Sequence, residues 1–263
     1  MGTVGGYEKV VSTDGTPIAF RRAGKGPPLV LVHGTTGSDF SWRFVEPLLS
    51  AHFTLHAMQR RGRGESGDGP GYSMVREAED VAAVVDSIGG SVDLFGHSYG
   101  ADCALEASLL TKNLRKLVLY EPAVEFPYPH ASIEEQERLA GQGKNEELIE
   151  LVFSAEGVLS ADEMAALKAS PTWPARVALA PTIPRESRED ARYTVSAQRF
   201  TDMRVPTLLL LGTESGKGFQ TSIEKVHEAL PDSRVVILEG HGHAAIMTAP
   251  ELVASEVIRF LTG

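Results

Sequence analysis

The sequence predicts an α/β protein: a mostly parallel, twisted sheet of about eight strands, with helices on both faces and an inserted helical lid. Strand-like apolar runs alternate with helical repeats over most of the 263 residues. That order is typical of parallel strands joined by right-handed crossovers. Residues 122–204 interrupt the alternation, because they contain prolines and charged helical patches but no strand-like run. A Gly-His-Ser-Tyr-Gly pentapeptide at 96–100 separates one strand from the helix that follows it.

In the first part of the chain we expect strands at residues 7–11, 18–22, 28–32 and 53–58, and helices near 40–49 and 78–88. The first two strands flank an Asp14-Gly15 turn, which predicts a hairpin. Residues 28–32 are continuously apolar, as in a strand covered on both faces. The helix at 78–88 follows from apolar residues that recur at helical spacing.

In the second part we expect strands at 92–95, 117–120, 207–211 and 235–238, and helices at 101–107, 223–230 and 251–261. These segments predict a core domain formed by residues 1–121 and 205–263, with residues 122–204 inserted as a lid. Within the lid, Ser160 followed by Glu163 forms a capping box and predicts the start of a helix.

Composition narrows the possible partners. The formal net charge of −10 disfavours nucleic acid and anionic membranes. The one cysteine, Cys103, excludes an internal disulfide and any CxxC metal site, so we expect neither a metal nor another cofactor. The sequence begins without a signal-peptide pattern, and no apolar run reaches membrane-spanning length. We therefore expect a cytoplasmic monomer or homodimer.

The pentapeptide predicts a nucleophile. A serine between two glycines, after a strand and before a helix, is typical of a strained turn that presents the Ser98 hydroxyl above the sheet. A serine hydroxyl needs a neighbouring base at neutral pH. We expect His243 to be that base, since it follows the flexible Gly242 in a loop after the last strand, and His241 competes for the role.

The oxyanion of an acyl-transfer reaction needs two backbone N–H donors. The N–H of Thr35, directly after His33-Gly34 at the end of an apolar strand, can provide one of them. The N–H of Tyr99, at the start of the helix after Ser98, can provide the other, because helix N-termini favour negative charge.

Four motifs occur in a fixed order: His33-Gly34, the glycine-rich loop at 60–66, the pentapeptide at 96–100, and Gly242-His243 followed by Pro250. On these motifs the sequence resembles an α/β-hydrolase, and the resemblance covers nearly the whole chain outside the lid. In most of that family an aspartate follows the seventh strand, but here Ser215 stands in its place, with Glu214 one residue earlier. A minority carry a glutamate at the end of the sixth strand, where Glu121 stands, so the resemblance favours Glu121 as the triad acid and keeps Glu214 as the alternative. The family's usual aspartate before the glycine-rich loop is replaced by Gln59, which we expect to alter local packing.

The resemblance implies a serine hydrolase that cleaves esters or lactones of a small apolar molecule. Cleavage of a carbon–carbon bond or a thioester, acyl transfer on the same triad, and a non-catalytic ligand receptor on this scaffold remain alternatives. The residues expected to contact substrate are small or aromatic: Gly34, Trp42, Phe126, Tyr128, Phe153 and Trp173.

Overall fold

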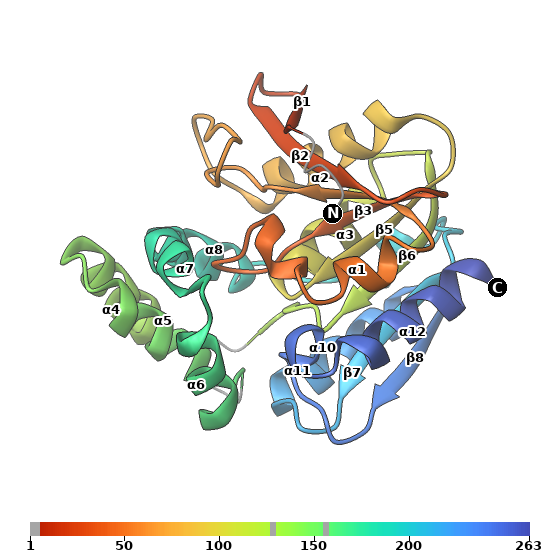
Figure 1. Ribbon diagram of the computed structural model, residues 1–263. Helices are drawn as coiled ribbons and strands as arrows, with labels where there is room; N and C mark the ends of the chain where they lie inside the picture. The colour runs from red at the N-terminus through yellow and green to blue at the C-terminus, as the bar shows by residue number, and fades with distance from the viewer. Residues whose placement is uncertain (1–5, 127–129, 155–157) are drawn as a thin grey trace.

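The computed structural model describes residues 6–126, 130–154 and 158–263 and is built on an eight-stranded sheet with strand order β1-β2-β4-β3-β5-β6-β7-β8 (Figure 1). The strands are β1 (Glu8–Val11), β2 (Pro17–Ala23), β3 (Pro28–Val32), β4 (Thr54–Met58), β5 (Val92–His97), β6 (Leu114–Tyr120), β7 (Thr207–Gly212) and β8 (Ser233–Leu238). β2 runs antiparallel to both β1 and β4, and the remaining neighbours are parallel. This is the mostly parallel sheet that the sequence predicts.

Two layers of helices cover the sheet, because successive strand side chains point to opposite faces. Leu94 of β5 packs in the cluster formed with α2 (Met74–Ile88), α3 (Tyr99–Ala107) and α10 (Lys217–Ala229). The next residue, Phe95, packs on the other face with α11 (Ala245–Thr248) and α12 (Pro250–Thr262). Both faces of the central strands are therefore buried, which explains their continuous apolar sequences.

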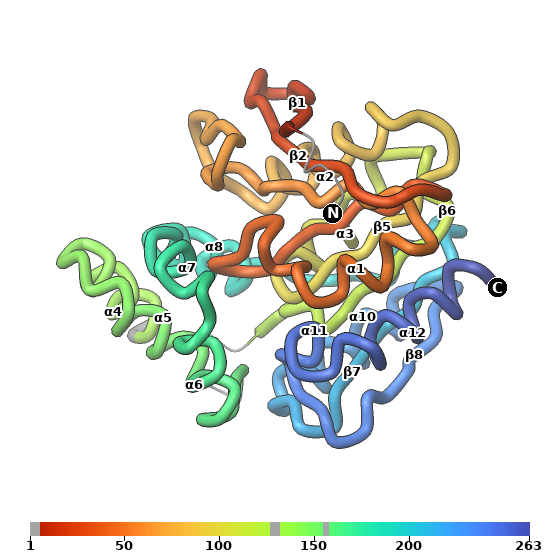
Figure 2. The backbone as a smooth tube through the Cα atoms, viewed as in Figure 1, coloured from red at the N-terminus to blue at the C-terminus, as the bar shows by residue number. Residues whose placement is uncertain are grey.

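Residues 122–204, here called the helical insertion, leave the sheet after β6 and return to it at β7 (Figure 2). The helices are α4 (His130–Gly141), α5 (Asn145–Ser154), α6 (Ala161–Ala169), α7 (Trp173–Leu179), the 3-10 helix η3 (Ala180–Thr182), α8 (Ile183–Asp190) and α9 (Ala197–Phe200). The labelled ones, α4 to α8, gather beyond one end of the sheet, at the left of Figure 1. The expected capping box is present at Ser160 and Glu163.

Hydrogen bonds fix both ends of the helical insertion to the core. The Pro122 carbonyl accepts from Ser222 Oγ at 2.7 Å, and the Ala123 N–H donates to Asp102 Oδ1 at 3.0 Å. At the return, the Pro206 carbonyl accepts from the Leu117 N–H at 3.0 Å. The chain therefore enters and leaves the helical insertion at fixed points beside β6 and β7.

Most expected elements are present, and one differs. The single helix expected near 40–49 is divided into a 3-10 helix, η1 (Asp39–Trp42), and a short α1 (Glu46–Leu49). Pro47 lies in the first turn of α1, where its missing N–H costs nothing, so the chain restarts a helix there instead of continuing one. Among the described residues, no helix combines the length and the apolar character that crossing a bilayer requires.

The glycine-rich loop contains three fully buried arginines, and their carboxylate partners come from other elements. Arg61 Nε is 2.7 Å from Asp80 of α2, and Arg60 Nη2 is 2.8 Å from Glu186 of α8. Gln59, at the place of the family's usual aspartate, donates from Nε2 to Asp39 Oδ1 at 2.8 Å. The loop thus packs through carboxylates of α2 and α8, and Arg60 joins the core to the helical insertion.

Candidate active site

Ser98 occupies the turn between β5 and α3 with a backbone φ of 56°, a left-handed conformation that a serine adopts only under constraint. The Ser98 N–H donates a hydrogen bond to the Tyr120 carbonyl at 2.9 Å. Thr36 and Glu121 also have positive φ values, so strained backbone is concentrated around one end of the sheet. This geometry is that of a nucleophile elbow.

Three glycines make the elbow sterically possible. A Cβ on Gly96 would lie 2.6 Å from the Ala101 Cα, and one on Gly100 would lie 2.4 Å from the Val32 carbonyl oxygen. A Cβ on Gly34 would lie 2.8 Å from Ser98 Cβ and 3.3 Å from its Oγ. The glycines therefore allow strand and helix to meet closely, and Gly34 leaves open the space beside the hydroxyl.

Glu121 and His243 form a buried pair. Glu121 lies directly after β6, is fully buried, and its Oε2 is 2.7 Å from His243 Nδ1. Its other oxygen, Oε1, accepts from the Gly212 N–H at 2.7 Å and from Ser215 Oγ at 2.6 Å. The carboxylate thus accepts hydrogen bonds from three donors. One of these is His243 Nδ1, which is therefore the protonated nitrogen of the imidazole.

The loop that contains His243 is tied to the ends of β5 and β6. The Tyr120 hydroxyl donates to the Gly242 carbonyl and accepts from the Ala245 N–H at 3.2 Å. His97 Nε2 donates to the His243 carbonyl at 3.0 Å. Burial lowers the pKa of His97 well below its usual value, so this imidazole is neutral and has one N–H to donate. Both contacts limit the movement of the His243 backbone.

Aromatic rings fix the plane of the His243 imidazole. Phe219 of α10 stacks on it with a centroid separation of 4.2 Å and an interplanar angle of 13°. His97 lies 4.6 Å from it, centroid to centroid. With Nδ1 bonded to Glu121, the ring directs its Nε2 away from that carboxylate.

The two residues whose amides are expected to donate to the oxyanion, Thr35 and Tyr99, lie in the segments that follow β3 and β5. Tyr99 is the first residue of α3, so its N–H belongs to the amides that a helix N-terminus leaves without an intrahelical acceptor. Thr35 follows Gly34 in a tight turn closed by the Gly37 N–H and the Gly34 carbonyl at 3.1 Å. His33 orders the start of this turn: it is fully buried, its Nδ1 donates to the Gly34 carbonyl at 2.9 Å, and its Nε2 accepts from the Arg60 N–H at 3.2 Å.

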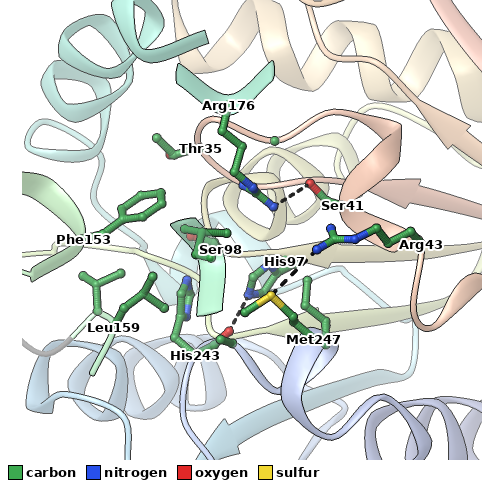
Figure 3. A pocket seen from close by; sticks show the side chains of 16 residues that line it. Thr35, Ser41, Arg43, His97, Ser98, Phe153, Leu159, Arg176, His243 and Met247 are labelled. Atoms are coloured by element: carbon green, nitrogen blue, oxygen red, sulfur yellow. Dashed lines mark hydrogen bonds between the residues drawn. The ribbon is translucent and has the colours of Figure 1, made fainter. Parts of the chain in front are cut away.

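A pocket of about 620 Å³, including space continuous with solvent, opens on Ser98 and His243 (Figure 3). Its apolar lining comes from the helical insertion and from α11: Phe153, Val158, Leu159, Leu167, Ile246 and Met247. Its polar wall comes mainly from the segment after β3 and from α7: Thr35, Ser41, Arg43 and Arg176. The pocket therefore has two chemically different sides.

Of the residues expected to contact substrate, Gly34 and Phe153 line this pocket. Trp42 does not: it is fully buried in the core cluster that contains Phe95, with 5.0 Å between the centroids of the two rings. Trp173 packs instead within the helical insertion, with Leu148 and Ile149. Tyr128 lies outside the described residues.

Phe126 is also displaced from the expected role. It is buried against Phe219, 5.0 Å between centroids, and so supports the ring that stacks on His243. Glu214, the alternative acid, is exposed, and Ser215 rather than Glu214 contacts Glu121. His241 is not among the described pocket residues, whereas His243 is. Across the described ranges, no three His, Cys, Asp or Glu side chains gather as a candidate metal site.

Sequence reasoning missed Ser41, Arg43, Arg176 and Met247 as pocket residues, and Phe219 as the ring stacked on His243. No motif marks them. Arg43 and Arg176 are far apart in sequence and meet only because the helical insertion folds back over the segment after β3.

Comparison with known proteins agrees with this geometry. The family model described as "Alpha/beta hydrolase family" matches residues 29–256. The N-formylmaleamate deformylase of Pseudomonas putida is 30% identical over 237 residues, covering 85% of this chain and 84% of that protein. The 2-(acetamidomethylene)succinate hydrolase of Mesorhizobium japonicum is 25% identical, covering 92% of this chain and 90% of that protein. A crystal structure of an alpha/beta hydrolase from Sphaerobacter thermophilus superposes with a TM-score of 0.84 at 33% identity, covering 97% of this chain and all of that one.

Proposed function

Because this chain belongs to the alpha/beta hydrolase family, we propose that it is a serine hydrolase that cleaves small carboxylic esters or lactones through an acyl-enzyme intermediate. One observation carries the proposal: the Glu121 carboxylate binds His243 Nδ1 at 2.7 Å, at a pocket that also exposes Ser98 on its strained turn. The nucleophile, the acid and the base thus lie in the segments that follow three different strands, β5, β6 and β8.

In this mechanism, Ser98 Oγ attacks the substrate carbonyl while His243 Nε2 takes the hydroxyl proton. Glu121 keeps the other imidazole proton on Nδ1 and stabilises the positive charge that forms on the ring. The amides of Thr35 and Tyr99 donate to the oxyanion of the tetrahedral intermediate. His243 then protonates the leaving group, and a water molecule activated by the same imidazole releases the acid product.

A second candidate is hydrolysis of an acyl–nitrogen bond. The names of two relatives, the deformylase and the acetamidomethylene-succinate hydrolase, refer to compounds that carry an N-acyl group. The same triad can serve this reaction, since an amide differs from an ester at the leaving atom, which His243 protonates in both cases.

The test is Ser98→Ala, assayed with p-nitrophenyl butyrate, butyrolactone and N-acetyl amides. We expect kcat/KM to fall about 10⁴-fold or more, because the attacking oxygen is lost. The matched control is Ser255→Ala, an exposed serine of α12, which should keep wild-type rates. A fluorophosphonate probe should label the wild type and the control but not Ser98→Ala.

Two results would contradict the proposal. Ester, lactone and amide cleavage that survives in Ser98→Ala would show that another group performs the chemistry. Stoichiometric labelling of Ser98 without turnover of any substrate class would support a ligand receptor on the hydrolase scaffold instead.

A further inference from the structure

Arg43 and Arg176 present two positive charges to the pocket that contains Ser98. Arg43 follows η1 in the core, and Arg176 belongs to α7 of the helical insertion. In Figure 3 both guanidinium groups lie on one side of Ser98, whereas Phe153 and Leu159 lie on the other. The pocket is therefore cationic at one end and apolar at the opposite end.

Neither of these arginines has a carboxylate partner in the described part of the chain. Arg43 Nη2 donates to Ser170 Oγ at 2.9 Å and lies 3.9 Å from Met247 Sδ, and Arg43 Nη1 lies 3.4 Å from the Phe40 carbonyl oxygen. Arg176 Nη2 reaches Ser41 Oγ at 3.5 Å. Arg176 Nε is buried and has no hydrogen-bond partner among the described residues. Both side chains thus retain donors that the protein itself does not satisfy.

The other arginines make the contrast clear. Every other described arginine that is partly or fully buried has an aspartate or glutamate oxygen within 4.0 Å. These are Arg21, Arg60, Arg61, Arg63, Arg76, Arg115 and Arg185. This chain therefore pairs its buried guanidinium groups with carboxylates, except at the pocket.

The pKa shifts of the two pocket arginines agree with the lack of a carboxylate partner. Burial, together with a smaller effect of the positive charge of Arg43, lowers the pKa of Arg176 to about 10. Burial also lowers the pKa of Arg43. Both groups still carry their charge at neutral pH, and an anion between them would relieve the desolvation and the repulsion together.

We propose that Arg43 and Arg176 bind a carboxylate of the substrate, so that the enzyme acts on an acyl compound with a free carboxylate near the scissile bond. A guanidinium group matches a carboxylate with two parallel hydrogen bonds, which fixes orientation as well as charge. With the carboxylate on the arginine side, the scissile carbonyl lies at Ser98, and any apolar part faces Phe153 and Leu159. This substrate class differs from the apolar one expected from the sequence, and it rests on the proposed hydrolase function.

The test compares two esters of similar size, monomethyl glutarate and the uncharged methyl valerate, in a pH-stat assay. The quantity measured is the ratio of kcat/KM for the charged ester to kcat/KM for the neutral one. We expect the wild type to favour the charged ester and Arg176→Met to reduce the ratio about 30-fold or more, because a desolvated charge pair loses one partner. Arg43→Met should reduce it in the same direction, and Arg176→Lys should reduce it less. The control Arg188→Met, an exposed arginine of α8, should leave the ratio unchanged.

A binding experiment separates this inference from the proposed function. Calorimetry of Ser98→Ala with glutarate, which has no bond to cleave, should show binding that is lost in Ser98→Ala/Arg176→Met. Glutarate binding that persists in the double variant, or a ratio that Arg176→Met and Arg43→Met leave unchanged, would overturn the carboxylate site. Either result would leave the role of Ser98 unaffected.

Discussion

Replacing Glu121 by glutamine tests the acid of the site, because the structure dictates how the new amide must lie. Glu121 Oε1 accepts from two donors, the Gly212 N–H and Ser215 Oγ, whereas Oε2 faces only His243 Nδ1. Glutamine has only one side-chain acceptor oxygen. In this fully buried position that oxygen should accept from the Gly212 N–H, because a backbone N–H can only donate a hydrogen bond. The NH₂ group then faces Nδ1 and forces the imidazole proton onto Nε2, where it blocks the base.

The size of the effect follows from this arrangement. Turning the amide over would restore the His243 tautomer but set two donors against each other at Gly212, which costs about 1–3 kcal/mol for a buried unsatisfied group. We therefore expect the wrong tautomer to dominate and kcat/KM to fall about 10³- to 10⁴-fold, or about 4–5.5 kcal/mol of transition-state stabilisation.

The assay is hydrolysis of p-nitrophenyl butyrate by Glu121→Gln, with Glu214→Gln as the matched control. Glu214 is exposed, so its variant should stay within about twofold of the wild type. Unfolding curves of both variants check that the fold is intact. The reasoning is refuted if Glu121→Gln keeps more than a tenth of the wild-type kcat/KM, or if Glu214→Gln loses as much.

Two further predictions concern groups next to the site. Ser215→Ala removes one of the two donors to Glu121 Oε1 and should lower kcat about 5- to 30-fold with little change in KM, whereas Ser215→Thr keeps the hydroxyl and should recover most of the rate; equal rates for the two variants would exclude positioning by the hydroxyl. Burial raises the pKa of Asp102 and of Asp190 well above the ordinary 3.8, and the charge of Asp102 raises that of Asp190 further. A raised folded-state pKa gives stability that is complete below the unfolded pKa and is lost as the pH rises through the folded one. Asp190→Asn cannot ionise at this position. The free energy of unfolding of the variant, relative to that of the wild type, should therefore increase as the pH rises above the ordinary pKa of 3.8 in urea titrations; a difference independent of pH would count against this explanation.

The sheet and the elbow follow from local sequence. Glycine is required at positions 96 and 100 because a Cβ there would lie 2.6 and 2.4 Å, respectively, from backbone atoms of nearby segments. The sequence motif therefore follows directly from the geometry of the turn. The division of the helix near residues 40–49 was not predicted. Apolar periodicity continues through that stretch, and only Pro47 indicates a new start.

The pairing of Glu121 with His243 depends on which strands are neighbours. Glu121 follows β6, Glu214 follows β7 and His243 follows β8, and these three strands are successive parallel neighbours, so their carboxyl ends lie at the same edge of the sheet. That is why the sequence allows two acids, and why the structure separates them: one fully buried against the imidazole, the other exposed. The pocket walls could not be predicted in this way. Trp42 and Trp173 have the right chemistry for a pocket, but their helices turn them into packed clusters.

The two arginines of the pocket illustrate the same limit. Nothing near Arg43 or Arg176 in the sequence distinguishes them from the arginines that form ion pairs. Their difference arises from the absence of a nearby carboxylate among the described residues, and that is a property of the folded chain alone.

The fixed attachment points of the helical insertion have a consequence for how new specificities arise. Asp102 and Ser222 hold the chain immediately after Glu121, and the Pro206 carbonyl is held where the chain returns. Phe126, which supports the ring stacked on His243, and Glu186, which pairs with buried Arg60, must be kept. We expect that a library that grafts foreign segments between residues 130 and 180 would vary the compounds accepted while the acid and the imidazole keep their positions.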